Sequence, residues 1–405
     1  MTDKKFVYFD NINNTQVAPE VIKAINNVLE SNPGNPASHV HSAGVNAGII
    51  VEESRSKIAD FINCDPKDII FTSGATESNN LAIQGYLHAN PDFGFVTTNI
   101  EHFSILNQAR KIKMTGRSVD ILPVNIDGTV NLNLLDSFLS SAPALVSISI
   151  ANPEIGVIHE IETISEICHK NGSFIHCDAT AAAGLMELNI IELDIDLLTL
   201  SAHNMHGPTG VGALYVKENI KIAPLFEGGN QEKGLRPGTE NLSGIAGFGE
   251  ACALAKKELP GRVEHLKKIG EKLWNGISDN VPFINFTGHP EKRLPGHVSF
   301  WVKHIEGESL LLLLSMNGIM VSSGSACSSN LKAKDEDELK ASHVLTAVGV
   351  PSDICAGSIT FSSSKYNSFE DVDHVMSVLP GLVERLLSMS PSYEDYIKSQ
   401  ETSNE

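Results

Sequence analysis

Residues 197–216 read LLTLSAHNMHGPTGVGALYV: an apolar strand, a polar turn, a glycine-rich elbow and a second apolar strand. The turn offers Ser201, His203, Asn204 and His206, which are side chain types found in binding sites, and it contains no lysine. Two buried strands joined by such a polar turn indicate a sheet with a site at its edge.

Over residues 67–216, short apolar segments alternate with segments of helical character. Helical segments at 75–89 and 161–171 lie between short apolar runs. The runs that we predict to be strands are 68–73, 93–98, 144–150, 172–178, 196–202 and the segment GVGALYV that ends at Val216. This pattern predicts an α/β fold with a mostly parallel sheet that is buried on both faces. The loops after 73, 178 and 202 then lie beyond the carboxyl ends of strands, where such sheets bind ligands.

The pattern changes after a long helix that begins near Glu240. Strands read as GHVSFWV, IMVSS and SITFSS, and they are mixed with the helices GESLLLLLSMN and FEDVDHVMSVLPGLVERLLSM. We therefore predict a large α/β domain over 16–259 and a smaller α+β domain formed by 1–15 and 260–405.

Composition excludes several classes of protein. The net charge of −19 argues against a protein that binds nucleic acid through a general excess of basic residues. The chain shows no apolar signal region at its start and no apolar run near the roughly 20 residues needed to span a bilayer, so we expect a cytoplasmic protein that does not bind membranes. The cysteines are scattered without CxxC pairs, which predicts free thiols and no zinc site: Cys64, Cys168, Cys177, Cys252, Cys327 and Cys355.

The segment TSGATESNN (72–80) runs from a strand through Gly74 into a helix that begins near Ala75 or Thr76. A glycine turn before a helix presents free amides and a positive dipole end to a phosphate group. The alternative is an ordinary helix cap made by Ser73 or Thr76.

Two further side chains follow predicted strands. Asp178, in IHCDATAAAG, could hold the protonated nitrogen of a pyridine ring, or it could cap the next helix. His102, in EHFSIL, could stack on a flat ring or transfer protons, or it could be structural.

Two loops lie closer to the C-terminus. Cys327 sits within VSSGSACSSN (321–330), and a small-residue polar loop suits a thiol that must react. The segment RPGTEN (236–241) suits an anion or a helix cap equally well.

In this order the segments resemble the cysteine desulfurases of the class V aminotransferase group. The resemblance covers almost the whole chain, from YFDN through SNPGNPASHVHSAG, FTSGATESNNLAI, EIGVI, GPTGVGALYV, RPGTENLSGIAGFGEA and EGESL to SSGSACSS and ASHVLTAVG. It implies a fold-type-I pyridoxal-phosphate protein with a seven-stranded type of sheet, a homodimer, and a site built at the interface between the subunits.

The resemblance also implies a role for each matching residue. His102 would stack on the pyridine ring, and Asp178 would pair with the ring nitrogen. Cys327 would attack the sulfur of bound L-cysteine and carry a persulfide to an iron–sulfur scaffold or another acceptor protein. The cofactor phosphate would be held by Gly74, Ala75, Thr76, Ser201 and His203 of one subunit. Thr239 of the partner subunit would also contact this phosphate.

The chain departs from the family at the cofactor lysine. The family reads Ser-x-His-Lys where this chain has Asn204, and no lysine occurs between Lys170 and Lys217. Asn204 can neither form the internal aldimine nor move the proton at the substrate α-carbon. Any pyridoxal phosphate would be held without a covalent bond to the chain, or there would be none.

At three further positions, the chain also lacks a family residue that contacts the cofactor or the substrate. Ala181 replaces a glutamine that reaches the phenolic oxygen of the cofactor, and Pro153 replaces an asparagine before EIG. Thr360 replaces the arginine that binds the substrate carboxylate, and a hydroxyl cannot supply that charge-assisted bidentate contact.

Two hypotheses follow. In the first, the chain is a desulfurase-like protein of sulfur mobilisation or iron–sulfur assembly that has lost ordinary pyridoxal catalysis. Cys327 then accepts persulfide, or ligates a cluster together with a partner, because the chain offers no metal site of its own. In the second, it is an active cysteine desulfurase that converts L-cysteine to L-alanine with noncovalently bound pyridoxal phosphate.

Overall fold

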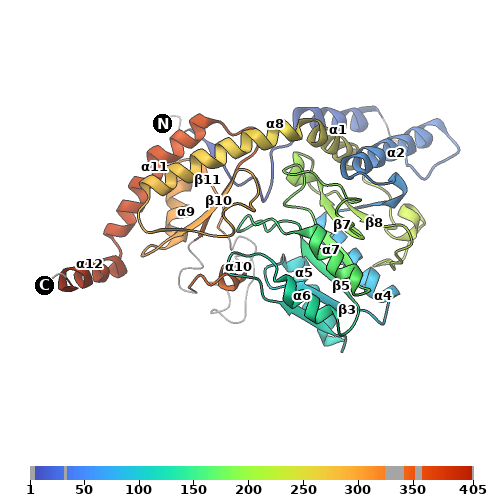
Figure 1. The fold of residues 1–405 in the computed structure, drawn as a ribbon. Helices are drawn as coiled ribbons and strands as arrows, with labels where there is room; N and C mark the ends of the chain where they lie inside the picture. The colour runs from blue at the N-terminus through green and yellow to red at the C-terminus, as the bar shows by residue number, and fades with distance from the viewer. Residues whose placement is uncertain (1–4, 32–33, 324–341, 352–357, 404–405) are drawn as a thin grey trace.

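A seven-stranded sheet forms the centre of the larger part of the protein (Figure 1). The computed structural model describes residues 5–31, 34–323, 342–351 and 358–403. The strand order is β2-β8-β7-β6-β5-β3-β4, and every pairing is parallel except those of β8 with β2 and β7. The strands are β2 (Ile69–Thr72), β3 (Gly94–Thr98), β4 (Val119–Leu122), β5 (Ala144–Ser149), β6 (Phe174–Asp178), β7 (Leu197–Ser201) and β8 (Gly212–Val216). The predicted α/β fold with a mostly parallel sheet is therefore confirmed.

Burial explains why the sequence pattern identified most of these strands. Every residue of β5 and β7 is buried, as expected for strands that are covered on both faces. The exception is β4, which we did not predict from the sequence. It lies at the sheet edge beside β3, and of its four residues only Leu122 is buried, so its hydrophobic pattern is weak.

Helices cover the two faces of the sheet with separate hydrophobic cores. One core takes Ile58 from α2 and Ile164 from α7, and the other takes Leu81 and Ile105. The helices of this part are α2 (Ser42–Ile62), α5 (Phe103–Met114), α6 (Leu132–Leu139) and α7 (Ile161–Lys170). Helix α1 (Pro19–Ser31) packs against α8 (Leu242–Asn280).

The helix predicted over 75–89 is divided into three pieces. It begins as α3 (Ala75–Asn80), widens into a π-helical turn at Leu81–Gly85, and ends as α4 (Tyr86–Ala89). The amide of Ala223 donates to the carbonyl of Gly85 at 2.9 Å, and a Cβ on that glycine would lie 2.6 Å from the carbonyl oxygen of Ala223. A neighbouring loop therefore presses against the helix here, which a helical periodicity does not reveal.

A second hydrophobic core lies around a three-stranded antiparallel sheet of order β12-β10-β9. The N-terminal strand β1 pairs in parallel with β11, so the first residues of the chain join this part. Its elements are β1 (Val7–Tyr8), β9 (Ile284–Phe286), β10 (His297–Val302), β11 (Ile319–Met320), β12 (Ser358–Ser362), α9 (Gly307–Met316), α10 (His343–Ala347), α11 (Phe369–Ser388) and α12 (Pro391–Ser403).

The long helix α8 (Leu242–Asn280) connects the two parts, as its course in Figure 1 shows. Phe248 packs in the core of the large sheet, and Leu273 packs in the core of the small one. The predicted domain boundary at 259/260 falls inside this helix, next to Pro260. None of the helices in the described part of the chain combines the length and apolar character that a bilayer crossing requires.

Candidate functional site

A cavity of about 580 Å³ opens beyond the carboxyl ends of β2, β6 and β7. Its position and size are those of a small-molecule site in an open α/β sheet. The predicted site residues in its lining are Gly74, Ala75, Thr76, His102, Asp178, His203 and Asn204. Two of the positions that depart from the family, Pro153 and Ala181, line it as well. The fold therefore brings together side chains that are up to 130 positions apart in the sequence.

Gly74 shapes the loop between β2 and α3. Its φ of 147° is a conformation that residues with a Cβ rarely adopt, and nothing lies within 4 Å of the position where a Cβ would stand. The loop is held from the side by Glu77, whose carboxylate accepts from the Ser73 amide at 2.8 Å. The first amides of a helix have no partner within it, so those of Ala75 and Thr76 suit an anion at this wall of the cavity.

A chain of hydrogen bonds connects His102 with Asp178. The Nδ1 of His102 lies 2.8 Å from the Ser104 hydroxyl, which accepts from Asn79 Nδ2 at 2.9 Å. The same amide nitrogen donates to Asp178 Oδ2 at 2.7 Å. This chain sets the orientation of His102 and Asp178 together. No local pattern distinguishes Asn79 as a site residue, although it stands in the TSGATESNN segment.

Asp178 suits the protonated nitrogen of a pyridine ring. Its side chain is buried, and its two oxygens accept from neutral amides, those of Asn79 and of the Thr180 backbone at 2.9 Å. Within the described residues it takes part in no ion pair. A buried carboxylate is normally paired with a positive charge, and a pyridinium N–H would supply one. The residues present therefore fit a pyridoxal-type cofactor at this end.

Glu101 lies behind this end of the site and is 1% exposed. It accepts from Thr98 Oγ1 at 2.7 Å and from the Ser149 amide at 3.0 Å. Burial raises the pKa of Glu101 to about 7, and the nearby charge of Asp178 adds to that effect while the two hydrogen-bond partners oppose it. No local pattern marks this carboxyl, because its burial depends on strands that are distant in the sequence.

Asn204 ties the turn after β7 to the N-terminal segment. Its Nδ2 donates to the carbonyl of Ile12 at 2.7 Å. Beside it, the Thr15 hydroxyl donates to the carbonyl of His203 at 2.6 Å. The amide of Asn204 therefore serves as a structural tether at the position where the family resemblance places a lysine.

His203 and Ser201 form a pair at the same turn. The Ser201 hydroxyl and His203 Nδ1 are 2.7 Å apart, and burial lowers the pKa of His203. His203 lines the cavity, whereas Ser201 is fully buried behind it. Ser201 can therefore contribute to a phosphate site through the orientation that it gives His203.

Thr360 lies behind the cavity wall. It is buried, and its hydroxyl donates to the carbonyl of Glu154 at 3.2 Å. Glu154 follows Pro153, and burial raises the pKa of its carboxyl to about 8. Asn152, beside Pro153, is used by the turn itself, because its Oδ1 accepts from the amides of Glu154 and Ile155. No cation replaces the family arginine among the described residues that line the cavity.

Thr239, like Ser201, is absent from the described lining of this cavity. Thr239 is exposed on the loop before α8, which is compatible with a role toward another subunit. Cys327 lies outside the described residues, as does Cys355.

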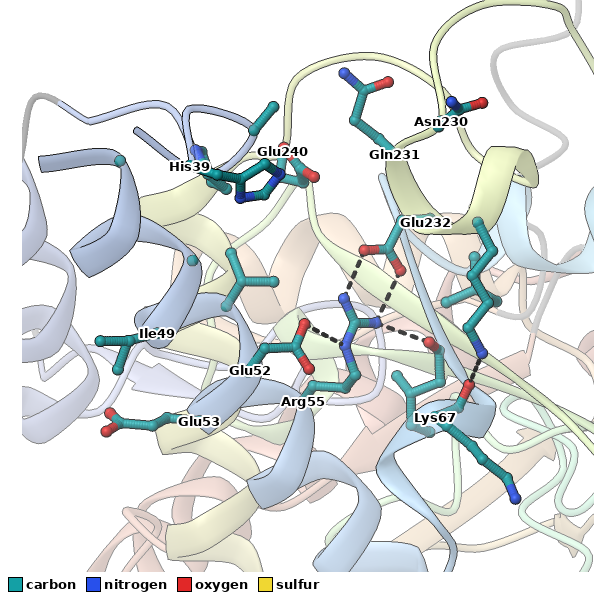
Figure 2. Close-up of a pocket in the computed structure, with 18 of the residues that line it drawn as sticks. His39, Ile49, Glu52, Glu53, Arg55, Lys67, Asn230, Gln231, Glu232 and Glu240 are labelled. Atoms are coloured by element: carbon teal, nitrogen blue, oxygen red, sulfur yellow. Dashed lines mark hydrogen bonds and ion pairs between the residues drawn. The ribbon is translucent and has the colours of Figure 1, made fainter. Parts of the chain in front are cut away.

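A buried ion pair, which the sequence did not reveal, holds the neighbouring loop in place. Figure 2 shows Arg55 of α2 reaching Glu232, with Nη2–Oε1 and Nη1–Oε2 distances of 2.7 and 2.9 Å. Glu232 also accepts from the amide of Phe71 in β2 at 2.7 Å. Next along this loop, Arg236 pairs with Glu77 at 2.9 Å. The loop is thus clamped to β2 and to the Gly74 turn, at the side of a surface groove of about 950 Å³.

Known proteins show the same organisation. The family model "Aminotransferase class-V" matches residues 7–375. "Cysteine desulfurase IscS 1" of Archaeoglobus fulgidus is 42% identical over 95% of this chain and 99% of its own length, and "Cysteine desulfurase IscS" of Methanosarcina thermophila is 41% identical over 96% and 95%.

Solved structures agree with these sequence relatives. A "NIFS-LIKE PROTEIN" superimposes with a TM-score of 0.87 at 33% identity, covering 94% of this chain and all of that one. The apo structure of the cysteine desulfurase from Thermococcus onnurineus has a TM-score of 0.83 at 27% identity, covering 94% and 95%. The chain has the fold of type I pyridoxal-phosphate proteins, and it belongs to the cysteine desulfurase family within the class-V aminotransferases.

Proposed function

We propose that this chain is a desulfurase-like protein of sulfur mobilisation whose ordinary pyridoxal chemistry is impaired, with Cys327 as a persulfide carrier or as a cluster ligand shared with a partner. The observation that carries the proposal is the composition of the cavity. Its described lining contains Asp178 and Glu77 but neither lysine nor arginine. Asn204, at the lysine position, is already bonded to Ile12.

The remaining residues support binding rather than turnover. Pyridoxal phosphate, when bound, supplies an electron sink for reactions at the α-carbon of an amino acid. Asp178 would hold its ring nitrogen, His102 would lie against its ring, and the Gly74 loop with His203 would hold its phosphate. The neutral amide of Asn204 cannot accept a proton from the α-carbon, and a positioned base contributes about 10²–10⁴-fold to such a step.

We further propose that the protein is a cytoplasmic homodimer that hands sulfur to an iron–sulfur scaffold or another acceptor protein. The A. fulgidus and M. thermophila relatives named cysteine desulfurase support the sulfur chemistry. In the exchange, a Cys327 thiolate would attack the terminal sulfur of a donor persulfide. The S–S bond of the donor breaks, the donor leaves as a thiolate, and Cys327 becomes the persulfide.

Alanine formation tests the impaired catalysis. The protein is incubated with L-cysteine and added pyridoxal phosphate, beside Cys327→Ala, and alanine and sulfide are measured. We expect the parent to form no more alanine than Cys327→Ala does. Alanine formation that depends on Cys327 would instead establish the alternative, an active desulfurase with noncovalent cofactor.

Persulfide transfer tests the role of Cys327. An active desulfurase of the family is supplied with ³⁵S-cysteine and mixed with this protein, and labelled persulfides are located by alkylation and mass spectrometry. We expect label on the parent and none on Cys327→Ala. Cys64→Ala is the matched control, because burial raises the pKa of the Cys64 thiol to about 12 and keeps it protonated and unreactive. Equal labelling of the parent and Cys327→Ala would contradict the proposed role.

A further inference from the structure

His102 has two places in the structure: it lines the cavity, and its side chain caps helix α5. The first amides of a helix have no partner within it, and here the amide of Ser104 donates to His102 Nδ1 at 3.1 Å. A backbone N–H donates and does not accept. Nδ1 therefore meets this amide with its lone pair, because a proton on Nδ1 would point at another proton.

The hydroxyl of Ser104 supports the same arrangement. It lies 2.8 Å from His102 Nδ1, and its oxygen accepts from Asn79 Nδ2 at 2.9 Å. Asn79 presents its nitrogen here because the same nitrogen donates to Asp178 Oδ2 at 2.7 Å, and a carboxylate can only accept. With one donor already on its oxygen, the Ser104 hydroxyl directs its own proton to Nδ1. Two donors of one buried residue thus point at the same ring nitrogen.

We infer that Ser104 fixes His102 as the tautomer with its proton on Nε2, so that His102 can donate a hydrogen bond but cannot take up a proton from a molecule in the cavity. A neutral imidazole has one N–H group and one lone pair. The lone pair on Nδ1 is used by α5, and Nε2 carries the proton. Ser104 is thereby a positioning residue, since it acts through His102.

This tautomer explains why His102 does not replace the missing lysine. Histidine is the side chain that most often acts as a general base, and His102 is exposed at the cavity wall. A base needs a lone pair that faces the substrate, whereas the lone pair of His102 faces the helix. The inference deepens the proposed function and rests on it only in taking this cavity as the place where an α-proton would have to be removed.

Nitrogen-15 NMR of the full chain, labelled at histidine, reports the tautomer, because protonated and unprotonated ring nitrogens resonate far apart. Spectra are recorded at about pH 8, where an ordinary histidine is neutral, without and with added pyridoxal phosphate. The signals of His102 are assigned by their loss in His102→Gln. We expect a single tautomer with the proton on Nε2 under both conditions. His88, exposed on α4, is the matched control and should show the averaged signals of two tautomers in exchange.

Ser104→Asp should reverse the tautomer, because a carboxylate only accepts and draws the proton to Nδ1. Nε2 then carries the lone pair and becomes reactive toward diethyl pyrocarbonate, which acylates unprotonated histidine nitrogens. We expect the rate at His102, relative to His88, to rise by about tenfold, the size of one helix-cap hydrogen bond. Ser104→Thr keeps both donors and should keep the parent rate. His176 is fully buried and should stay unmodified in each variant that is folded.

A proton on Nδ1 of His102 in the parent, or tautomer exchange like that of His88, overturns the inference, and this spectrum does not require any variant to fold. With His176 still protected, a Ser104→Asp variant in which His102 keeps the parent tautomer and rate also overturns it. None of these outcomes depends on alanine formation or on label at Cys327, so they are distinguishable from failure of the proposed function.

Discussion

At the scale of single residues, the hydrogen bonds that the site's side chains make with the rest of the protein determine their roles. Asn204 is tethered to Ile12, Asp178 is held by Asn79, and Glu101 lies beneath them as a buried carboxyl. A replacement at one such position alters hydrogen bonding and charge together. The chemistry of this cavity therefore depends on neighbours as well as on the residues that line it.

Glu101 makes the stability of the protein depend on pH. Its pKa is about 7 when folded, against about 4.3 for an unfolded glutamate. Between these values the folded chain keeps a proton that the unfolded chain has released. Its contribution to stability is therefore complete below about pH 4.3 and is lost as the pH rises through 7.

Glu101→Gln imitates the protonated carboxyl and has no proton to lose. We expect its free energy of unfolding to fall less than that of the parent between pH 4.5 and 7.5, by about 3 kcal/mol, as measured by urea unfolding at a series of pH values. Glu53→Gln, at an exposed position of α2, is the matched control and should leave the pH dependence unchanged. Parallel curves for the parent and Glu101→Gln would contradict the assignment.

At the scale of elements, the Gly74 loop is positioned by α2 and by the loop before α8. Arg55 contributes two hydrogen bonds to Glu232 and one to the carbonyl of Ile69 at 2.8 Å, and its guanidinium lies 4.7 Å from the ring centroid of Phe71. Glu232 itself adopts a φ of 46°, an uncommon conformation for a residue with a side chain. The ion pair and the amide of Phe71 hold it there.

Breaking this pair should weaken both the fold and the cradle. Glu232→Gln removes the buried carboxylate partner of Arg55 and leaves it only the exposed Glu52 at 3.1 Å, so we expect a loss of about 3–5 kcal/mol in the free energy of unfolding. The exposed pair Lys67–Glu218, at 3.2 Å, is the matched control. Glu218→Gln should cost less than about 1 kcal/mol. Urea unfolding measures both, and equal losses would show that the buried pair has no special role.

At the scale of the whole molecule, the cavity lies on the large sheet while the segments that close it come from elsewhere. Ile12, Asn13 and Asn14, which line it, lie between strand β1 of the small core and helix α1. Helix α8 runs through both cores, so the two parts cannot move independently without bending it near Pro260. Fragments cut at the predicted domain boundary would therefore divide a continuous helix.

The proposed homodimer makes a prediction at this scale. Val40, Val45 and Ile49 are exposed at and before the start of α2, and the last two line the groove of Figure 2. Exposed apolar side chains gathered in this way favour an interface. We expect the parent to elute as a dimer in size-exclusion chromatography with light scattering, and Val45→Asp with Ile49→Glu to shift it to a monomer. Ile191→Asp, an exposed apolar residue elsewhere, is the control. A monomeric parent would contradict the proposal.

The sequence by itself determined the class of fold and the elements that carry the site. Apolar runs and glycine turns are local signals, so they located six strands of the large sheet, the Gly74 turn, and the placement of Asp178 and His102 after strands. The same signals missed the exposed edge strand β4 and the π-helical turn at Leu81–Gly85, because these depend on neighbours in space.

Only the tertiary structure decided what each side chain does. The Asn79–Asp178 bond joins residues 99 positions apart, the Arg55–Glu232 pair 177, and the Asn204–Ile12 bond 192. No local pattern encodes such a partner, since it is set by how the strands and loops meet. The sequence could therefore show that a lysine is missing, whereas the fold shows that its replacement holds the N-terminal segment through the carbonyl of Ile12.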